Sequence, residues 1–132
     1  MKALIVMICM AGLLPLALAG DTTLPRVDPA DTRNHVGETA IVCGKVVGAD
    51  VLKNAISGHG FPVSFDLDQP EPNPVFYFIA FGTQPGGPEE AVAAYQGKRV
   101  CVTGKITTAP SGGPPFILAA HRSQINVQPE QK

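Results

Sequence analysis

The residue types that most often do chemistry are few in this chain, and its cysteines are the most informative of them. Cys43 and Cys101 each lie in a strand-like segment that also carries a glycine, over residues 41–47 and 100–106. Four interpretations are open for the pair: a structural disulfide, two buried free thiols, a redox pair and a metal site. Redox pairs commonly show Cys-x-x-Cys spacing, which is absent, and zinc requires two further ligands. The pattern favours a disulfide between an early and a late strand.

The histidines offer neither a metal site nor a catalytic pair by their local spacing. His35, His59 and His121 are widely separated and lack Glu-x-x-His or His-x-x-x-His partners. We interpret each of them as a surface or loop histidine. The sequence therefore predicts no metal and no cofactor.

Two aspartates and two serines give weaker signals. Asp66 and Asp68 are expected to share the polar face of one strand, but Ca²⁺ takes six or more oxygen ligands and few lie close in sequence. A solvated strand face is the prediction. Ser57 and Ser111 lie in glycine-containing loops without a nucleophile-elbow pattern. No catalytic residue set emerges, and we expect a protein that is not an enzyme.

The first 19 residues have the pattern of a secretory signal peptide. Lys2 supplies a positive charge, residues 3–18 are almost wholly apolar, and residues 17–19 form a small-x-small cleavage site. A membrane anchor is the alternative, but a spanning helix needs about 20 apolar residues, and this run is shorter and interrupted by Pro15. We expect a periplasmic or secreted protein with no membrane span after cleavage.

Composition indicates a turn-rich β-protein. The 132 residues include 14 glycines and 13 prolines, and these fall mostly between apolar clusters, where turn residues belong. The formal net charge is −1 and no basic run occurs. Proteins that hold phosphate backbones usually carry a positive surface, so the charge balance argues against strong nucleic-acid binding.

Apolar alternation predicts five strands and two short helices. The strands are expected at residues 38–47, 61–68, 75–81, 98–107 and 116–120, with residues 123–127 extending the last one. Helices are expected at residues 29–35 and 88–96, each beginning with a proline, and a helical turn is expected at 50–56. The predicted organisation is a signal peptide at 1–19, a leader with a short helix at 20–37, one domain at 38–127 and a flexible tail at 128–132.

Three strands, a helix and two further strands form the element order of the OB-fold, a partly open five-stranded Greek-key barrel. The predicted fold is therefore an all-β OB barrel with one short helix between strands three and four, plus a short N-terminal helix. Five segments also carry a family resemblance: His-Val-Gly-Glu-Thr-Ala at 35–40, Val-Cys-Gly-Lys-Val at 42–46, Pro-Asn-Pro-Val-Phe at 72–76, Gly-Lys-Arg-Val-Cys-Val-Thr-Gly-Lys-Ile at 97–106 and Ser-Gln-Ile at 123–125. They resemble a family of small exported bacterial OB-fold proteins, grouped with nucleic-acid-binding OB domains of the anticodon-binding type. The resemblance implies the fold and brings no defined set of catalytic or ligand-binding residues.

The OB barrel makes strands one and four antiparallel neighbours, which places the cysteines. If Cys43 faces Cys101, then Val42 faces Val102, and the even-numbered residues of both strands share one side. That side is expected to be the barrel interior, with the two sulfurs outside. A disulfide closing this loop stabilises the fold by about 4 kcal/mol in the chain-entropy estimate.

OB-folds bind ligands across strands two and three, flanked by the loops that join strands one to two and four to five. Strand three alternates so that Tyr77, Ile79 and Phe81 are expected to point outward, where exposed aromatic rings could stack on bases. Lys53 in the first loop could meet a phosphate, and Lys45 and Lys105 are less securely placed on that face. The alternative is that the outward residues pack under a loop, a helix or another subunit.

Two functions of different class remain open at this stage. The first is a non-enzymatic exported module that binds single-stranded nucleic acid or a nucleotide-like ligand on the strand two–three face, through Tyr77, Phe81, Lys53, Lys45 and Lys105. The second is a structural or protein-interaction domain of the cell envelope, suggested by the low charge and an apolar outward patch.

Overall fold

The computed structural model of the chain describes residues 23–53, 62–81 and 87–129. The predicted signal peptide at 1–19 lies outside the described residues, as do Ser57, His59 and the last part of the predicted tail. No helix in the described part of the chain is long and apolar enough to cross a membrane.

Short strands dominate the described residues. The elements, in chain order, are β1 (Arg26–Val27), the 3-10 helix η1 (Pro29–His35), β2 (Thr39–Val51), β3 (Val63–Leu67), β4 (Tyr77–Ala80), α1 (Pro88–Tyr95), β5 (Arg99–Lys105), β6 (Phe116–Ala119), the 3-10 helix η2 (Arg122–Gln124) and β7 (Ile125–Val127).

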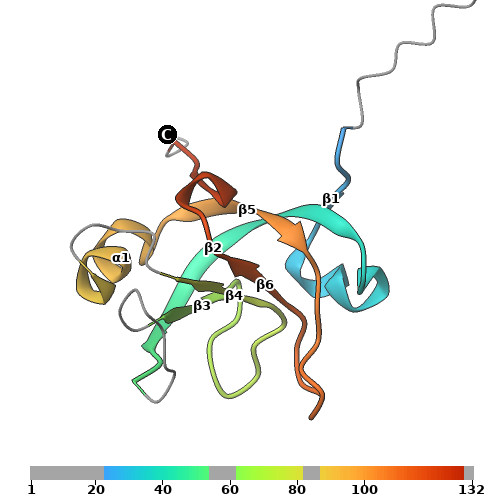
Figure 1. Cartoon of the computed structure of the whole chain (residues 1–132), viewed down its shortest axis with the longest axis horizontal. Helices are drawn as coiled ribbons and strands as arrows, with labels where there is room; N and C mark the ends of the chain where they lie inside the picture. Colours follow the sequence, from blue (N-terminus) through green and yellow to red (C-terminus); the bar gives the residue numbers. More distant parts are fainter. Residues whose placement is uncertain (1–22, 54–61, 82–86, 130–132) are drawn as a thin grey trace, which may run out of the picture.

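The long strand β2 organises the fold because it belongs to both halves of the curled sheet (Figure 1). Its first half pairs antiparallel with β5, and its second half pairs antiparallel with β3. The register shifts between Val46 and Gly48, which marks a bulge where the strand passes from one half to the other. A Cβ atom on Gly44 would lie 2.8 Å from Oδ1 of Asp68 and 3.0 Å from Cγ of Pro29, so side chains approach this glycine closely, and the bulge lies further along the strand.

The strand connectivity is that of an OB-like barrel. Strands β2, β3, β4, β5 and β6 correspond to the five predicted strands, and the sheet order is β6-β4-β3-β2-β5-β7. β4 and β6 pair in parallel. Thr107 and Phe116 exchange backbone hydrogen bonds of 2.9 and 2.8 Å, which brings the end of β5 to the start of β6 and partly closes the barrel.

Several details differ from the sequence prediction. The described sheet has seven strands instead of five, because β1 pairs with β2 and residues 125–127 form a separate strand on β5. The N-terminal helix is of the 3-10 type, and η2 was not predicted. The helical turn expected at 50–56 is wrong for Asp50 and Val51, because both pair with β3 as part of β2. Backbone pairing with β3 outweighs the weak helical preference of those two residues.

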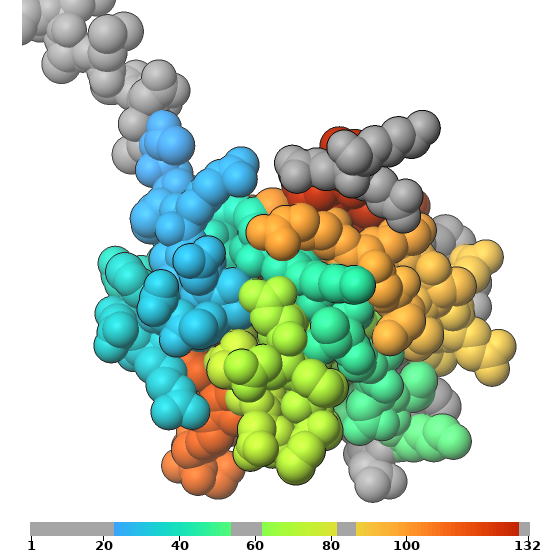
Figure 2. Space-filling view, turned by 180° about the vertical axis from the view of Figure 1, so that it is seen from behind, coloured from blue at the N-terminus to red at the C-terminus, as the bar shows by residue number. Residues whose placement is uncertain are grey.

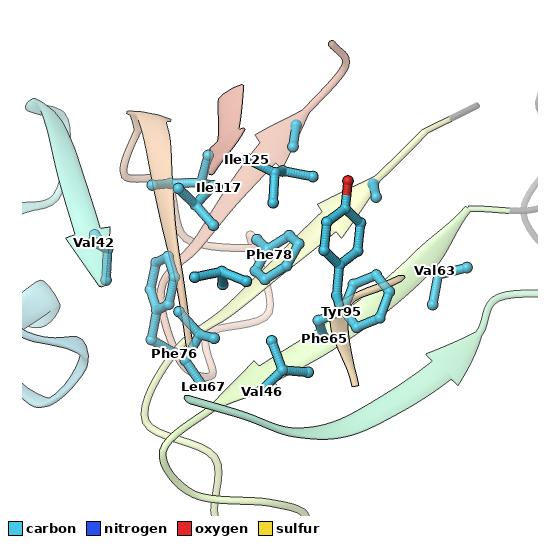
Figure 3. Close-up of a cluster of buried hydrophobic side chains, with 14 of the residues drawn as sticks. Val42, Val46, Val63, Phe65, Leu67, Phe76, Phe78, Tyr95, Ile117 and Ile125 are labelled. Atoms are coloured by element: carbon cyan, nitrogen blue, oxygen red, sulfur yellow. The ribbon is translucent and has the colours of Figure 1, made fainter. Parts of the chain in front are cut away.

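The core fills the inside of the curled sheet with apolar side chains from every long strand (Figure 3). Phe65 and Phe78 stack with ring centroids 5.0 Å apart, and Tyr95 of α1 meets Phe65 edge-on at 5.5 Å. Pro29 and Thr32 of η1 are also buried. In Figure 1, α1 and η1 lie at opposite ends of the curled sheet. Seen from behind in Figure 2, residues 62–81 lie at the centre of the surface, between the N-terminal segment in blue and β2 in green.

The predicted disulfide is present between Cys43 and Cys101, with an S–S distance of 2.04 Å. The predicted register is confirmed as well: Cys43 pairs with Cys101, Val42 with Val102, and Gly44 with Val100. Val42 and Val102 are fully buried inside the barrel, so the bridge lies on the outer side of the sheet. The pair is therefore a structural element and no longer a candidate for chemistry.

Candidate functional site

The outer surface of β3, β4 and β6 carries the candidate site, and the strand register arranges its side chains in two rows. One row runs from Asp66 to Tyr77 to Phe116, and the neighbouring row runs from Ser64 to Ile79 to Leu118. The intervening residues of β4, Phe78 and Ala80, are buried in the core. The alternation predicted for this strand is the one observed.

A groove of about 700 Å³ opens over the β3 and β4 members of these rows. Tyr77 and Ile79 contribute to it from β4, and Ser64 and Asp66 from β3. The proline-rich connection between β3 and β4 forms a wall through Pro70, Glu71, Pro72 and Pro74, and Asp50 of β2 lies at another edge. Because proline fixes its own backbone torsion, this wall has little freedom to close over the groove or to move away from it.

The aromatic part of the surface is a stacked pair instead of isolated rings. Tyr77 and Phe116 lie with ring centroids 5.1 Å apart and an interplanar angle of 16°. Both side chains are half-buried, and the pair arises because β4 and β6 run in parallel with these two residues in register. Sequence reasoning identified Tyr77 and missed Phe116, although the parallel pairing of strands three and five in an OB barrel would have placed it.

The groove is acidic. Asp66 is only 8% exposed, and a Cβ on Gly48 would lie 3.0 Å from its Oδ2 atom, so the glycine leaves room for the carboxylate. Burial raises the pKa of Asp66 above its usual 3.8, and the negative charges of Glu71 and Asp50 raise it further, while a backbone hydrogen bond from Glu71 opposes them. The groove thus concentrates three carboxyl groups, and no lysine or arginine is among its lining residues in the described chain.

The same environment acts on the tyrosine. Burial raises the pKa of Tyr77 above 10.0, and the nearby charges of Asp66 and Glu71 act in the same direction. The phenol therefore stays protonated at neutral pH and can donate a hydrogen bond.

The expectation that Asp66 and Asp68 share a solvated strand face is wrong. Asp66 is buried in the groove, whereas Asp68 lies beyond the end of β3 with a positive φ of 67°. The Oδ1 atom of Asp68 accepts a hydrogen bond of 2.9 Å from the backbone N–H of Lys45. A turn residue in the left-handed region breaks the strand alternation, which removed Asp68 from that face.

The predicted ligand-binding residues separate into two groups. Tyr77 and Phe81 come from the β3–β4 side, and both are half-buried. Lys53 is exposed just after the end of β2. Lys45 and Lys105 are exposed on the half of the sheet formed by β2 and β5, and neither lines the β3–β4 groove. The structure therefore does not bring Lys45 and Lys105 together with the aromatic residues, whereas Lys53 directly follows Leu52, which lines the groove.

Within the described residues, no group of three or more histidine, cysteine, aspartate or glutamate side chains is arranged to hold a metal ion. His35 instead pairs with Glu38, with 2.7 Å between Nδ1 and Oε2. His121 caps the short helix η2, where its backbone N–H donates to the side chain of Gln124 at 3.0 Å.

No protein family and no curated protein matches the chain. Among solved structures, similarity is found to a crystal structure described as an aspartyl-tRNA synthetase from Leishmania major Friedlin. The match has 11% sequence identity and a TM-score of 0.48, and it covers 83% of this chain and 22% of that protein. The chain thus spans less than a quarter of the length of that protein, and a likeness of this degree carries no functional argument.

Proposed function

We propose that this chain is an exported, non-enzymatic OB-like binding module that takes its ligand in the β3–β4 groove. The groove has an aromatic and aliphatic floor and a proline-rich wall, which suits recognition better than reaction. The Cys43–Cys101 disulfide supports export, because disulfides persist mainly in oxidising compartments.

The observation that carries the ligand class is the charge of the groove. Asp50, Asp66 and Glu71 line it without a cationic partner among the other lining residues. Such a site attracts positive charge and repels phosphate. Apolar surface next to carboxylates suits a segment of a partner protein that presents lysine or arginine beside apolar side chains. The favoured ligand is therefore a basic segment of another envelope protein.

Single-stranded nucleic acid or a nucleotide-like ligand is the second candidate, and the Tyr77–Phe116 ring pair favours it. Aromatic rings on this face of an OB-fold can hold stacked bases. A base bound there would have to direct its phosphates away from the three carboxylates, toward Lys53 or out of the groove. We expect this binding to be weaker than that of a cationic peptide.

The test compares two fluorescently labelled probes by anisotropy at low salt: a short peptide of alternating lysine and alanine, and an oligo-dT strand. We expect the peptide to bind and the oligonucleotide to bind weakly. The double variant Asp66→Asn/Glu71→Gln should lower peptide affinity by about tenfold, because it removes two of the three groove charges.

Glu90→Gln is the matched control, because Glu90 is an exposed carboxylate on α1 outside the groove. It should leave peptide affinity unchanged. Tighter binding of oligo-dT than of the peptide, abolished by Tyr77→Ala, would reject the cationic ligand in favour of the nucleic acid. Equal loss in Glu90→Gln and in the groove variant would reject the groove as the site.

A further inference from the structure

A second groove lies on the other half of the sheet, and its chemistry is the opposite of the first. It has a volume of about 680 Å³ and is lined by residues from β2, from the turn that leads into β5 and the first residue of that strand, and from the end of β7 and the chain that follows it. Its charged members are Lys45, Lys98 and Arg99. No aspartate or glutamate is among its lining residues in the described part of the chain.

The strand register explains why positive charge gathers here. Lys45 of β2 pairs directly with Arg99 of β5, in the position next to the Cys43–Cys101 pair on the outer face. Like charges placed directly opposite each other in an antiparallel pair destabilise the sheet. The fold gains nothing from this arrangement, so a binding role is the simplest reason for it.

Neighbouring carboxylates do not neutralise the groove. In the described ranges, the one ion pair within 4.0 Å joins His35 and Glu38. Both residues precede β2, and neither lines this groove. Asp68 is the carboxylate next to Lys45, but its Oδ1 atom is held by the backbone N–H of Lys45 at 2.9 Å. Even with Asp68 counted, positive charge is in excess around the groove.

The backbone beneath the charges is firmly held. The N–H of Val46 donates to the carbonyl of Lys98 at 2.8 Å, and the N–H of Gly97 donates to the carbonyl of Val46 at 3.0 Å. The N–H of Gln128 donates to the carbonyl of Arg99, also at 2.8 Å. These bonds and the adjacent disulfide fix the backbone positions from which the three cationic side chains extend, which reduces the part of the ordering cost of binding that the backbone would contribute.

We infer that the groove lined by Lys45, Lys98 and Arg99 is an anion site that binds phosphate groups, in the form of a compact diphosphate. An arginine guanidinium donates two parallel hydrogen bonds to a phosphate, and the two lysine ammonium groups add charge without demanding one geometry. The Gln128 side chain offers a further amide donor at the rim. The two grooves share no lining residue, although β2 borders both, so the site does not depend on the function proposed for the β3–β4 groove.

The absence of aromatic side chains among the described lining residues selects phosphate over base recognition. A single-stranded nucleic acid is usually held by base stacking as well as by charge. A diphosphate needs only the cations, and it would place negative charge over the repelling Lys45–Arg99 pair. A nucleic-acid backbone or a lipid headgroup could present the same phosphate chemistry. The experiment below therefore includes a probe for each of these two sources.

The experiment titrates the protein without its predicted signal peptide at 1–19 with inorganic pyrophosphate at low ionic strength and follows binding by calorimetry. We expect saturable binding that weakens as salt is raised, as ion pairing requires. The double variant Lys45→Gln/Arg99→Gln should lower the affinity by about tenfold or more. Its thermal midpoint should equal or exceed that of the parent, because a like-charge pair is removed.

Lys105→Gln is the matched control, since Lys105 lies on β5 at the far end of the same ladder, opposite Thr39. It should leave pyrophosphate affinity unchanged. Oligo-dT and vesicles containing phosphatidylglycerol are tested in parallel. If the parent binds one of them and the double variant does not, the result supports the site and identifies the larger molecule that carries the phosphate. The site is rejected if pyrophosphate fails to bind at millimolar concentration, or if Lys105→Gln weakens it as much as the double variant. Binding of DNA or vesicles without pyrophosphate rejects it as well.

Discussion

At the scale of single residues, Asp66 links the stability of the fold to the chemistry of the groove. Its carboxyl group is nearly enclosed between Gly48 and the acidic lining, which is an unfavourable place for a negative charge. Residues with perturbed pKa values inside a groove are frequent at functional sites. Ionisation of Asp66 does not stabilise the fold, and a carboxylate in such a place is consistent with a role in holding a cationic ligand.

The raised pKa of Asp66 predicts how stability changes with pH. Because the folded pKa is above the unfolded value of 3.8, the folded protein retains a proton that the unfolded chain has lost. The contribution of Asp66 to stability is full below the unfolded pKa and is lost as pH rises through the folded pKa. Asp66→Asn should remove this loss, so the difference in thermal midpoint between variant and parent should grow in favour of the variant as pH rises.

Thermal unfolding followed between about pH 3 and pH 7 measures this difference. Asp31→Asn, a change at an exposed aspartate of η1, serves as the control and should run parallel to the parent. Parallel curves for Asp66→Asn and the parent would contradict the prediction.

At the scale of elements, the close approach of β6 to β5 requires a glycine at position 104. A Cβ atom at Gly104 would lie 2.6 Å from Cγ2 of Ile117 on β6, closer than real side-chain contacts allow. Ile117 is fully buried, so it cannot move aside without disturbing the core. The sequence indicated that this glycine faces the interior, but it could not show which strand passes over it.

We expect Gly104→Ala to lower the free energy of unfolding by about 1–3 kcal/mol, the usual cost of overpacking a core. Urea denaturation measures the change. A second substitution, Ile117→Leu, removes the methyl group at the point of contact, so the double variant should lose less stability than the sum of the two single variants. Strict additivity would mean that the two residues do not meet as the structure shows.

Individual elements also show what can be predicted from sequence. The strand cores, α1 and the cysteine register were predictable because alternation and turn residues are local signals, and strand pairing follows once the order of elements is known. The strand β1 was missed because two residues carry too little periodicity to stand out, and β7 was expected only as an extension of the last strand, without the short helix η2 that separates them. The stack of Tyr77 on Phe116 depends on the parallel pairing of β4 with β6, which joins residues far apart in the chain.

At the scale of the whole molecule, the two halves of one sheet carry opposite charge. The β3–β4 groove collects Asp50, Asp66 and Glu71, whereas the groove beside β5 collects Lys45, Lys98 and Arg99. The net charge of −1 averages these surfaces and conceals them. From sequence, Lys45 and Lys105 were therefore grouped with the aromatic residues as ligand-binding candidates. Only the path of β2 through both halves of the sheet shows that these two lysines lie on the half formed by β2 and β5.

The disulfide ties the first half of β2 to β5 and closes a loop that contains the other half of the sheet, and its removal is the test at this scale. Cys43 and Cys101 are 58 residues apart, and β3, β4 and α1 all lie within the loop that they close. Restricting so long a loop in the unfolded chain stabilises the fold by about 4 kcal/mol in the chain-entropy estimate. We expect Cys43→Ala/Cys101→Ala to lose up to that amount in urea denaturation, and a reducing agent to lower the parent to the level of the variant while leaving the variant unchanged. Free thiols at Cys43 and Cys101 in the denatured, unreduced protein would instead show that the strands are held together by pairing and packing alone.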